Sequence, residues 1–326
     1  MNKTQAFFAA SFFAAVGAFG PTACSSSDRD FSSSSNDAGG PSPGSTTTDE
    51  GGATGNFVPT DHSDAASDGC SDEARLVYVL SLEGDLYSFA PADKKFTKVG
   101  PLTCQEIAGL TPISMAVGRD AVAWVNMRDT SNPFDLTPTG TLFKVDVKTG
   151  KCSPSAVKGN IGGMGFSVDA PSKTDETLYI VGGPNFTSSG LARVDLKAQK
   201  IVTIGKLPNF GQPTDLELTG TGDGKLYSLL VAQPMGLSEV NKTSAQFATP
   251  ANLSQVEEPQ SPMFAFSFWG GDFYIYTATD TSPTKTTNVT RYRPSDGSVN
   301  TTYMTNIGFH IVGAGVSTCA PTSPPK

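Results

Sequence analysis

The sequence is poor in the residues that carry most hydrolytic and metal chemistry. Its 326 residues include two histidines, His62 and His310, and five cysteines that form no CxxC pair. A Ser-His-Asp catalytic arrangement depends on a well-placed histidine, and structural zinc sites usually take closely spaced pairs of ligands. We therefore expect neither of these sites. The stretch GTGDGKL is no phosphate-binding loop either, because Leu226 stands where Ser or Thr must meet magnesium.

Long hydrophobic runs are absent after residue 20. The single N-terminal run, from Ala6 to Gly20, follows Lys3 and leads into a stretch of small residues, which is typical of a signal peptide over residues 1–23. The run is too short to be a membrane-spanning helix of ~20 residues. The small-residue stretch ends at Cys24 and is followed by a polar chain, a pattern that resembles the bacterial lipobox.

This resemblance implies that Cys24 becomes the lipidated first residue of the mature chain and anchors it to a membrane. Ser25, in place of Asp after the cysteine, is similar to the pattern that directs lipoproteins to the outer membrane. Pro21 departs from the lipobox, where leucine or another apolar residue is usual. Ordinary secretion, with cleavage after Ala18 or Ala23, therefore stays open as the alternative to an exported lipoprotein.

An excess of positive charge is also missing. Nine of the 31 acidic residues, but one of the 23 basic residues, lie between Ser25 and Asp72. The acidic balance thus belongs to this segment, and without a net basic surface elsewhere we expect no nucleic-acid partner. Residues 24–69 are rich in Ser, Gly and Asp, a composition that cannot offset the entropy lost on ordering. They are predicted to be a flexible tether.

The rest of the chain contains a repeat of about 50 residues. Five apolar segments begin the units, and their last residues are Val117, Val168, Leu218, Phe268 and Val316. Each of the first four is followed by an aromatic-bearing segment such as DFYIYT and then by two more segments joined by tight turns such as KTGK. Four short strands at this period are the signature of a β-propeller. An all-β fold is therefore expected for residues 70–326.

The two ends of the repeat array complement each other. The first unit, from Arg75, lacks its first strand, and the last segment, HIVGAGVSTC, is a first strand without followers. We expect the C-terminal strand to complete the first blade and to close a monomeric five-bladed propeller. A Cys70–Cys319 disulfide would join the ends at this seam and stabilise the fold by about 4 to 5 kcal/mol. Cys104 would then pair with Cys152 on the outer rim.

The segments FWGGDFY, RYRPSDG and IVGAGVSTCAP, together with the polar tether, resemble lipoproteins of myxobacterial type that carry a β-propeller domain. The likeness spans nearly the whole chain. It implies a fold and a membrane anchor, but it implies no activity, because a fold does not determine a function.

Two acidic residues interrupt the small-residue face of the predicted inner strands. Asp215 and Glu217 stand where the other units carry Ser, Ala or Gly, and residues i and i+2 share one face of a strand. Two buried carboxylates repel each other unless a cation or hydrogen-bond donors satisfy them. One interpretation is a central site for a polar ligand or a cation such as Ca²⁺, with His310 near its mouth. The other is that hydroxyls, backbone N–H groups or a neighbouring arginine satisfy the carboxylates, and that His310 is also structural.

The loops at the face where the inner strands begin are long and rich in Asn, Pro and aromatic residues. Long loops on a rigid scaffold often bind ligands. Phenyl rings beside amides would suit a glycan or a peptide, unless the rings pack under their own loops. The candidate residues are Asn132, Phe134, Asn185, Phe186, Asn209, Phe210 and Gln212.

Two classes of function remain. The first is a non-catalytic binding or scaffold module of the cell envelope that recognises a glycan, a peptide or a partner protein and needs no cofactor. The second is an extracytoplasmic hydrolase, glycosidase-like or cation-dependent, that uses central carboxylates. The five-bladed glycosidases that it would resemble use three acids from different blades, whereas this sequence offers Asp215, Glu217 and, in a turn, Asp169. The shortage of histidines and of convergent acids favours the binding module.

Overall fold

The computed structural model describes residues 69–131, 139–170, 174–185, 190–211 and 214–325. The expected signal peptide, the lipidation site and residues 25–68 of the tether lie outside these ranges, as do Asn132, Phe134, Phe186 and Gln212. Within them the chain forms 19 strands and two 3₁₀ helices, η1 (Glu73–Arg75) and η2 (Gln105–Ile107). Neither helix of the described chain is long and apolar enough to cross a membrane. The all-β class expected from the sequence is confirmed.

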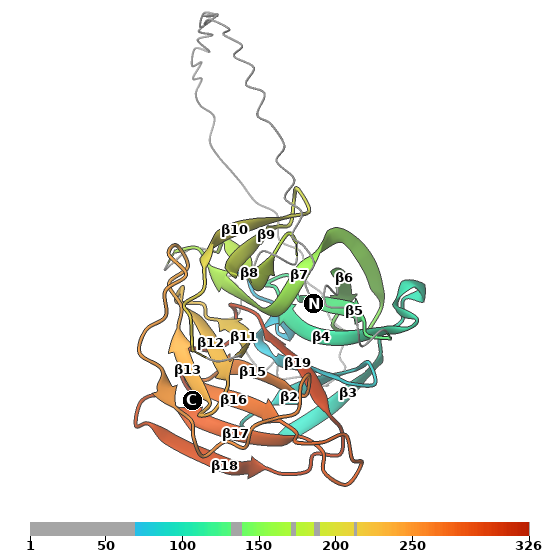
Figure 1. Cartoon of the computed structure of the whole chain (residues 1–326). Coiled ribbons are helices and arrows are strands. Elements are labelled where there is room, and N and C mark those ends of the chain that lie inside the picture. Colours follow the sequence, from blue (N-terminus) through green and yellow to red (C-terminus); the bar gives the residue numbers. More distant parts are fainter. Residues whose placement is uncertain (1–68, 132–138, 171–173, 186–189, 212–213, 326) are drawn as a thin grey trace, which may run out of the picture. The chain divides into compact units, whose positions relative to one another are not determined.

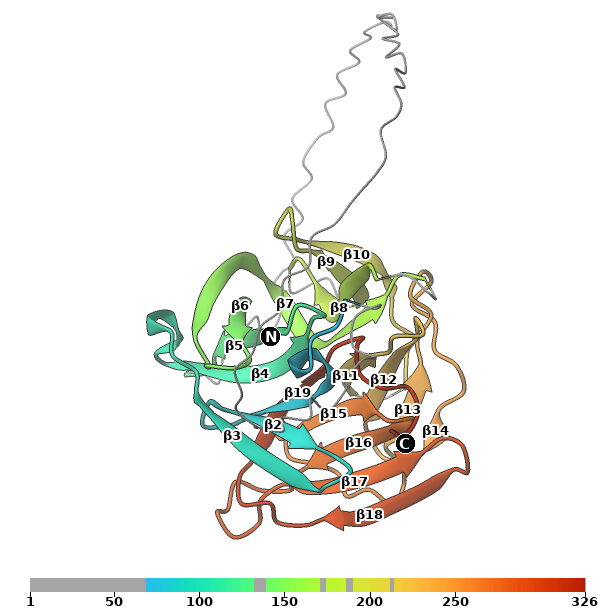
Figure 2. The same ribbon diagram turned by 180° about the vertical axis from the view of Figure 1, so that it is seen from behind.

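The strands form four antiparallel sheets (Figures 1 and 2). The first sheet pairs the C-terminal strand with the first strand, in the order β19 (Ile311–Val316), β1 (Val77–Ser81), β2 (Asp85–Ala90) and β3 (Lys95–Pro101). The third has the order β11 (Asp215–Gly220), β12 (Leu226–Val231), β13 (Gly236–Glu239) and β14 (Ala251–Asn252). The fourth has the order β15 (Phe264–Trp269), β16 (Asp272–Thr277), β17 (Asn288–Arg293) and β18 (Ser298–Met304).

The second sheet has seven strands because one strand serves two units of the repeat. It contains β4 (Leu110–Val117), β5 (Val122–Asp129), β6 (Gly140–Asp146), β7 (Cys152–Val168), β8 (Glu176–Gly183), β9 (Gly190–Asp195) and β10 (Lys200–Lys206). The first half of β7 pairs with β6 and the second half with β8. The repeat predicts two separate strands here, the last of one unit and the first of the next, and this expectation is wrong. The pairing shifts between Ile161 and Met164 instead, and such an irregularity lets a strand bend without leaving its sheet.

One strand of each repeat unit packs against the corresponding strands of its neighbours. β4 contacts β19 and β7, β11 contacts β7 and β15, and β15 contacts β19. Figure 1 shows these five strands gathered together, with β3, β10 and β18 farther out. They are the strands that begin the units of the sequence repeat, and we call them the inner strands.

The core lies between the sheets, and β15 shows how the strand pattern builds it. Phe264, Phe266 and Phe268 pack with residues of the third sheet such as Leu229. The alternate residue Ala265 packs on the opposite side, with residues of the first sheet such as Val79. The large and the small residues of β15 thus lie on opposite faces, because successive side chains of a strand point to opposite sides of its sheet.

Two disulfides tie segments that lie apart in the sequence. Cys70 is joined to Cys319 with a Cα–Cα distance of 5.8 Å, and Cys104 is joined to Cys152 at 5.0 Å. These are the two pairs expected from the sequence. The Ser317 hydroxyl also donates a hydrogen bond to the carbonyl of a residue of η1, so the segment before β1 and the segment after β19 are held together by a covalent bond and a buried hydrogen bond.

A close approach of β7 to β11 depends on Gly163. A Cβ atom at this position would lie 2.3 Å from the Leu216 carbonyl oxygen and 2.4 Å from the Glu217 Cα. Both are backbone atoms, which cannot turn away as the end of a flexible side chain can. The space beside Glu217 therefore exists because residue 163 has no side chain.

We predict that Gly163→Ala lowers the free energy of unfolding by about 2 kcal/mol or more, because overpacking a dense core costs about 1–3 kcal/mol. Gly162→Ala is the matched control on the same strand, since its nearest neighbour would be the Val181 carbonyl oxygen at 3.3 Å. Denaturant unfolding followed by tryptophan fluorescence compares the two variants. Equal stabilities would contradict the close packing of β7 on β11.

Candidate functional site

A cavity of about 180 Å³ opens where the inner strands begin, and we call it the polar cavity. It is formed by residues near the starts of β4, β11 and β15, in the middle of β7, and near the ends of β5 and β8. Its lining residues are Ile113, Arg128, Gly162, Gly163, Val181, Thr214, Asp215, Leu216, Glu217, Ser261, Pro262 and Phe264. The cavity thus combines apolar walls with three ionisable side chains.

Glu217 is the buried acid of this cavity, with 2% of its surface exposed. Its Oε1 accepts hydrogen bonds from the Ser114 hydroxyl at 2.7 Å, from the Met164 N–H at 2.8 Å and from the Leu218 N–H at 3.3 Å. Burial nevertheless dominates over these donors and raises the pKa of Glu217 to about 8. At neutral pH this side chain is therefore mainly a neutral carboxylic acid.

Asp215 lies on the same strand two residues earlier and lines the same cavity, but it is exposed. The expectation of two buried carboxylates is therefore wrong, because only Glu217 of the pair is buried. Desolvation by the cavity walls raises the pKa of Asp215, while a hydrogen bond from Ser261 and the charge of Arg128 act to lower it. The two acids therefore meet different environments, although they line one cavity as the i, i+2 spacing predicts.

Arg128 brings a positive charge to the polar cavity from the end of β5. One of its terminal nitrogens donates to the Ile161 carbonyl oxygen at 2.5 Å, beside a second hydrogen bond at 2.7 Å from the Asn126 amide to the same oxygen. Its Nε is buried and has no hydrogen-bond partner in the described part of the chain. Burial lowers the pKa of Arg128, and the negative charge of Asp215 opposes that effect.

The hydrogen bonds of Glu217 bear on the two interpretations of the acid pair. A serine hydroxyl and backbone N–H groups satisfy Oε1, as the structural interpretation expects. A cation is disfavoured, because Arg128 places a positive charge in the same cavity. Across the described ranges, no group of three or more His, Cys, Asp or Glu side chains is placed to hold a metal ion.

His310 and Asp169 do not join this site, contrary to their grouping in the sequence analysis. His310 does not line the polar cavity; it is 5% exposed, and its Nε2 is buried without a hydrogen-bond partner in the described part of the chain. Asp169 accepts a hydrogen bond from the Thr177 hydroxyl at 2.7 Å, just beyond the end of β7. It follows Gly163 by six residues, which corresponds to roughly 20 Å along a strand.

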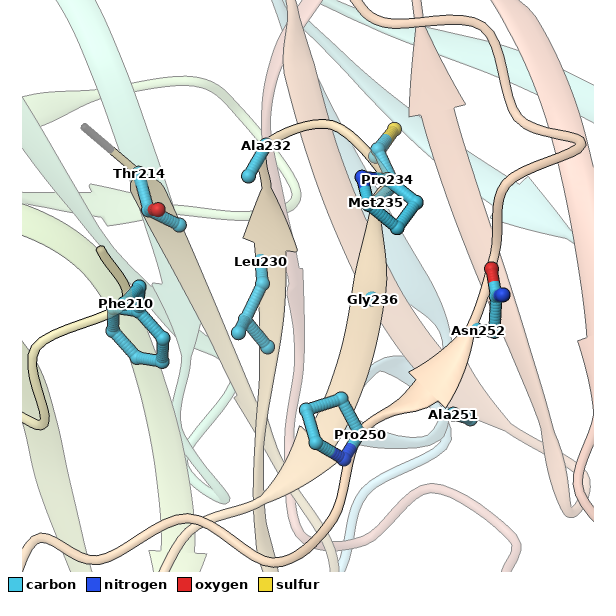
Figure 3. A pocket seen from close by; sticks show the side chains of 10 residues that line it. All are labelled: Phe210, Thr214, Leu230, Ala232, Pro234, Met235, Gly236, Pro250, Ala251 and Asn252. Carbon is cyan, nitrogen blue, oxygen red and sulfur yellow. The ribbon is translucent and has the colours of Figure 1, made fainter. Parts of the chain in front are cut away.

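A second, larger pocket of about 270 Å³ adjoins the polar cavity, and we call it the Phe210 pocket (Figure 3). Its lining residues are Phe210, Thr214, Leu230, Ala232, Pro234, Met235, Gly236, Pro250, Ala251 and Asn252. The Phe210 ring is held edge-on against Phe247 with 5.3 Å between ring centroids. Thr214 lines both the Phe210 pocket and the polar cavity, so the two hollows share a wall.

The predicted binding residues of the loops lie in different surroundings in the structure. Phe210 lines a pocket and packs on Phe247 at the same time. Asn209 caps its own turn by accepting the Gly211 N–H at 2.9 Å, and Asn185 is exposed and lines neither hollow. The sequence analysis missed Arg128. The stretch AVAWVNMRD shows a charged residue near the end of a mainly apolar strand, but it does not show which cavity that residue lines.

The buried acid makes stability depend on pH. Glu217 has an ordinary pKa of 4.5 and a pKa of about 8 in the folded protein, so the folded state holds the proton more tightly than the unfolded state. The stability gained from this is complete below about pH 4.5 and is lost as the pH rises toward about 8.

We predict that the wild type loses about 3 kcal/mol more of its unfolding free energy between pH 5 and pH 8 than Glu217→Gln does. The glutamine keeps an oxygen acceptor for Ser114 and Met164 but cannot ionise. Thermal unfolding at pH 5, 6, 7 and 8 measures the difference, and Glu106→Gln, an exposed acid, is the control. Parallel pH profiles for the wild type and Glu217→Gln would contradict the raised pKa.

No protein-family model matches this sequence, and no curated protein matches it. Among solved structures, a nidogen–laminin complex contains a chain that is 8% identical, with 74% of this chain and 97% of that chain covered and a TM-score of 0.44. A protein of unknown function from Bacteroides caccae is 11% identical over 74% of this chain and 97% of its own, with a TM-score of 0.40. A glycoside hydrolase is 12% identical over 57% and 46%, with a TM-score of 0.41. Because these scores lie below 0.5, none of the three likenesses bears on what this chain does.

Proposed function

We propose that residues 70–326 form a five-bladed β-propeller whose first blade is completed by the C-terminal strand. Three observations support this proposal. The seven-stranded sheet contains two four-stranded units that share β7, which brings the number of units to five. β19 pairs with β1. The inner strands also contact one another in the cyclic order β19, β4, β7, β11 and β15.

The propeller is, in this proposal, a non-catalytic binding module of the cell envelope, exported and anchored in the outer membrane through a lipid on Cys24. Its ligand is a glycan, a peptide or a segment of a partner protein. The main support for a binding role is that the Phe210 pocket and the polar cavity are adjacent, since Thr214 lines both of them. One elongated ligand can place an apolar group in the Phe210 pocket and a polar group in the polar cavity.

Thermal unfolding of the oxidised protein against envelope glycans, short peptides and divalent ions tests this role. A ligand at ~100 times its dissociation constant adds ~2.7 kcal/mol to stability, and for a domain of this size we predict a rise in the unfolding temperature of roughly 5–10 °C. Phe210→Ala should reduce the rise. Phe96→Ala, which removes a half-buried ring stacked at 4.3 Å on another ring of the first sheet, should not. A flat panel would count against a small-ligand site and favour a protein partner, to be sought by cross-linking on cells.

The alternative function, an extracytoplasmic hydrolase, is favoured by one observation. Glu217 is mainly protonated at neutral pH because its pKa is about 8, and Asp215 lies two residues away in the same cavity. An acid and a base with separated pKa values are what glycoside hydrolysis requires. If this function holds, chromogenic glycosides are cleaved, and Glu217→Gln lowers kcat by at least a hundredfold. Turnover unchanged in that variant would exclude a catalytic role for Glu217.

A further inference from the structure

We propose that the polar cavity recognises the zwitterionic head of an α-amino acid, with the ligand carboxylate against Arg128 and the ligand ammonium against Asp215 and Glu217. The inference rests on the proposed binding function and names the chemistry of its polar subsite. The head is either that of a free amino acid or that of the exposed end of a larger molecule.

The first step of the argument is that charges of both signs line one small cavity. Arg128 and Asp215 each respond to the other's charge, yet in the described part of the chain they form no ion pair within 4.0 Å. Each therefore keeps hydrogen-bonding capacity for a third molecule. A lone cation would meet the repulsion of Arg128 and a lone anion that of Asp215, whereas a dipolar ligand can satisfy both groups.

The second step concerns the atoms that are left for a ligand. Among the described residues, the Ile161 carbonyl accepts a hydrogen bond from one terminal nitrogen of Arg128. The Nε is closed to solvent, so the other terminal nitrogen is the one that can meet a ligand carboxylate. The three hydrogen bonds that Glu217 accepts from described residues all go to Oε1. Oε2 of Glu217 is thus the oxygen left to meet a ligand, and Glu217 is one of the residues that line the cavity.

The third step is a matter of size and surroundings. A cavity of about 180 Å³ is smaller than the ~300–1,000 Å³ of pockets for drug-sized ligands, so it suits a compact group. The neighbouring Phe210 pocket is lined mainly by apolar residues such as Leu230 and Met235. An amino acid with an apolar side chain can place its head in the polar cavity and direct its side chain past Thr214.

The arrival of an ammonium group has a measurable consequence. Glu217 is mainly protonated at pH 7.5, because its pKa is about 8. A positive charge beside Oε2 favours the carboxylate, so the Glu217 O–H bond breaks and the proton passes to the buffer. Binding at this pH should release up to ~0.8 proton per site. A neutral sugar in the same cavity would release none.

Isothermal titration calorimetry of the full chain with L-leucine at pH 7.5, in phosphate and in Tris, measures affinity and proton release together. We expect binding whose heat differs between the buffers in proportion to the released proton. N-Acetyl-L-leucine, which lacks the ammonium, and L-leucinamide, which lacks the carboxylate, should bind at least about tenfold more weakly. γ-L-Glutamyl-L-leucine presents the same zwitterionic head on a larger molecule and is titrated separately. If it binds and leucine does not, the natural ligand is the end of a larger molecule. If leucine binds, the natural ligand is a free amino acid.

Two variants connect the signal to the cavity. Glu217→Gln should abolish proton release and weaken leucine about tenfold, and Arg128→Gln should weaken it by a similar factor. Arg128→Lys serves if the glutamine variant fails to fold. Arg193→Gln, at an exposed arginine of β9, should change nothing.

Equal binding of leucine and its acetylated form, or binding without proton release, would overturn the proposal. So would the absence of binding by leucine and by γ-L-glutamyl-L-leucine. If glycans or other peptides still raise the unfolding temperature in that case, the binding function stands and the zwitterion fails. If the whole panel is flat, the zwitterion fails together with every other small ligand, and a protein partner is the one form of the binding function left to test.

Discussion

The close approach of the inner strands is the constraint on which the rest of the fold depends. A Cβ on Gly313 would lie 3.1 Å from the backbone nitrogen of Met115, and one on Gly315 would lie 2.9 Å from that of Val117. An interior packed at this density cannot accept another carbon atom unless the backbone moves. The small residues that recur in the sequence repeat are therefore a packing requirement, and a large acidic side chain among them needs a separate explanation.

Glu217 is that exception. Its side chain occupies space beside Gly163 and draws on Ser114 and Met164, which lie on two other inner strands. Three donors do not compensate for its burial, since its pKa still rises to about 8. Serine, alanine and glycine hold the equivalent positions elsewhere without that penalty. Local violations of folding rules are expected where a site needs them, and so the cost of burying Glu217 is itself an argument that its carboxyl group is used.

Much of the fold and half of the cavity could be predicted from the sequence. The period of the repeat predicted the strands. Asp215 and Glu217 stood out because they interrupt the small residues of the inner strands. Arg128 could not be assigned to the cavity from the sequence, because no local pattern shows how far one sheet is shifted along its neighbour. The grouping of His310 and Asp169 with the acids failed for the same reason: a repeat identifies equivalent strands, but position along a strand, at ~3.3 Å per residue, decides which side chains meet.

The unforeseen continuity of β7 and the unforeseen arginine are one feature. Where the repeat predicts the end of one strand and the start of another, a single strand continues, and its pairing shifts after Ile161. At that shift the Ile161 carbonyl oxygen accepts hydrogen bonds from both Asn126 and Arg128. The second of these bonds holds the guanidinium of Arg128 in the wall of the cavity that β11 also lines, and Gly163, two residues further along β7, leaves room for Glu217. A separate loop between the two units would leave neither the carbonyl nor the glycine fixed in this position. The irregular strand therefore positions the charge and the space that together make the polar cavity a site for a dipolar ligand.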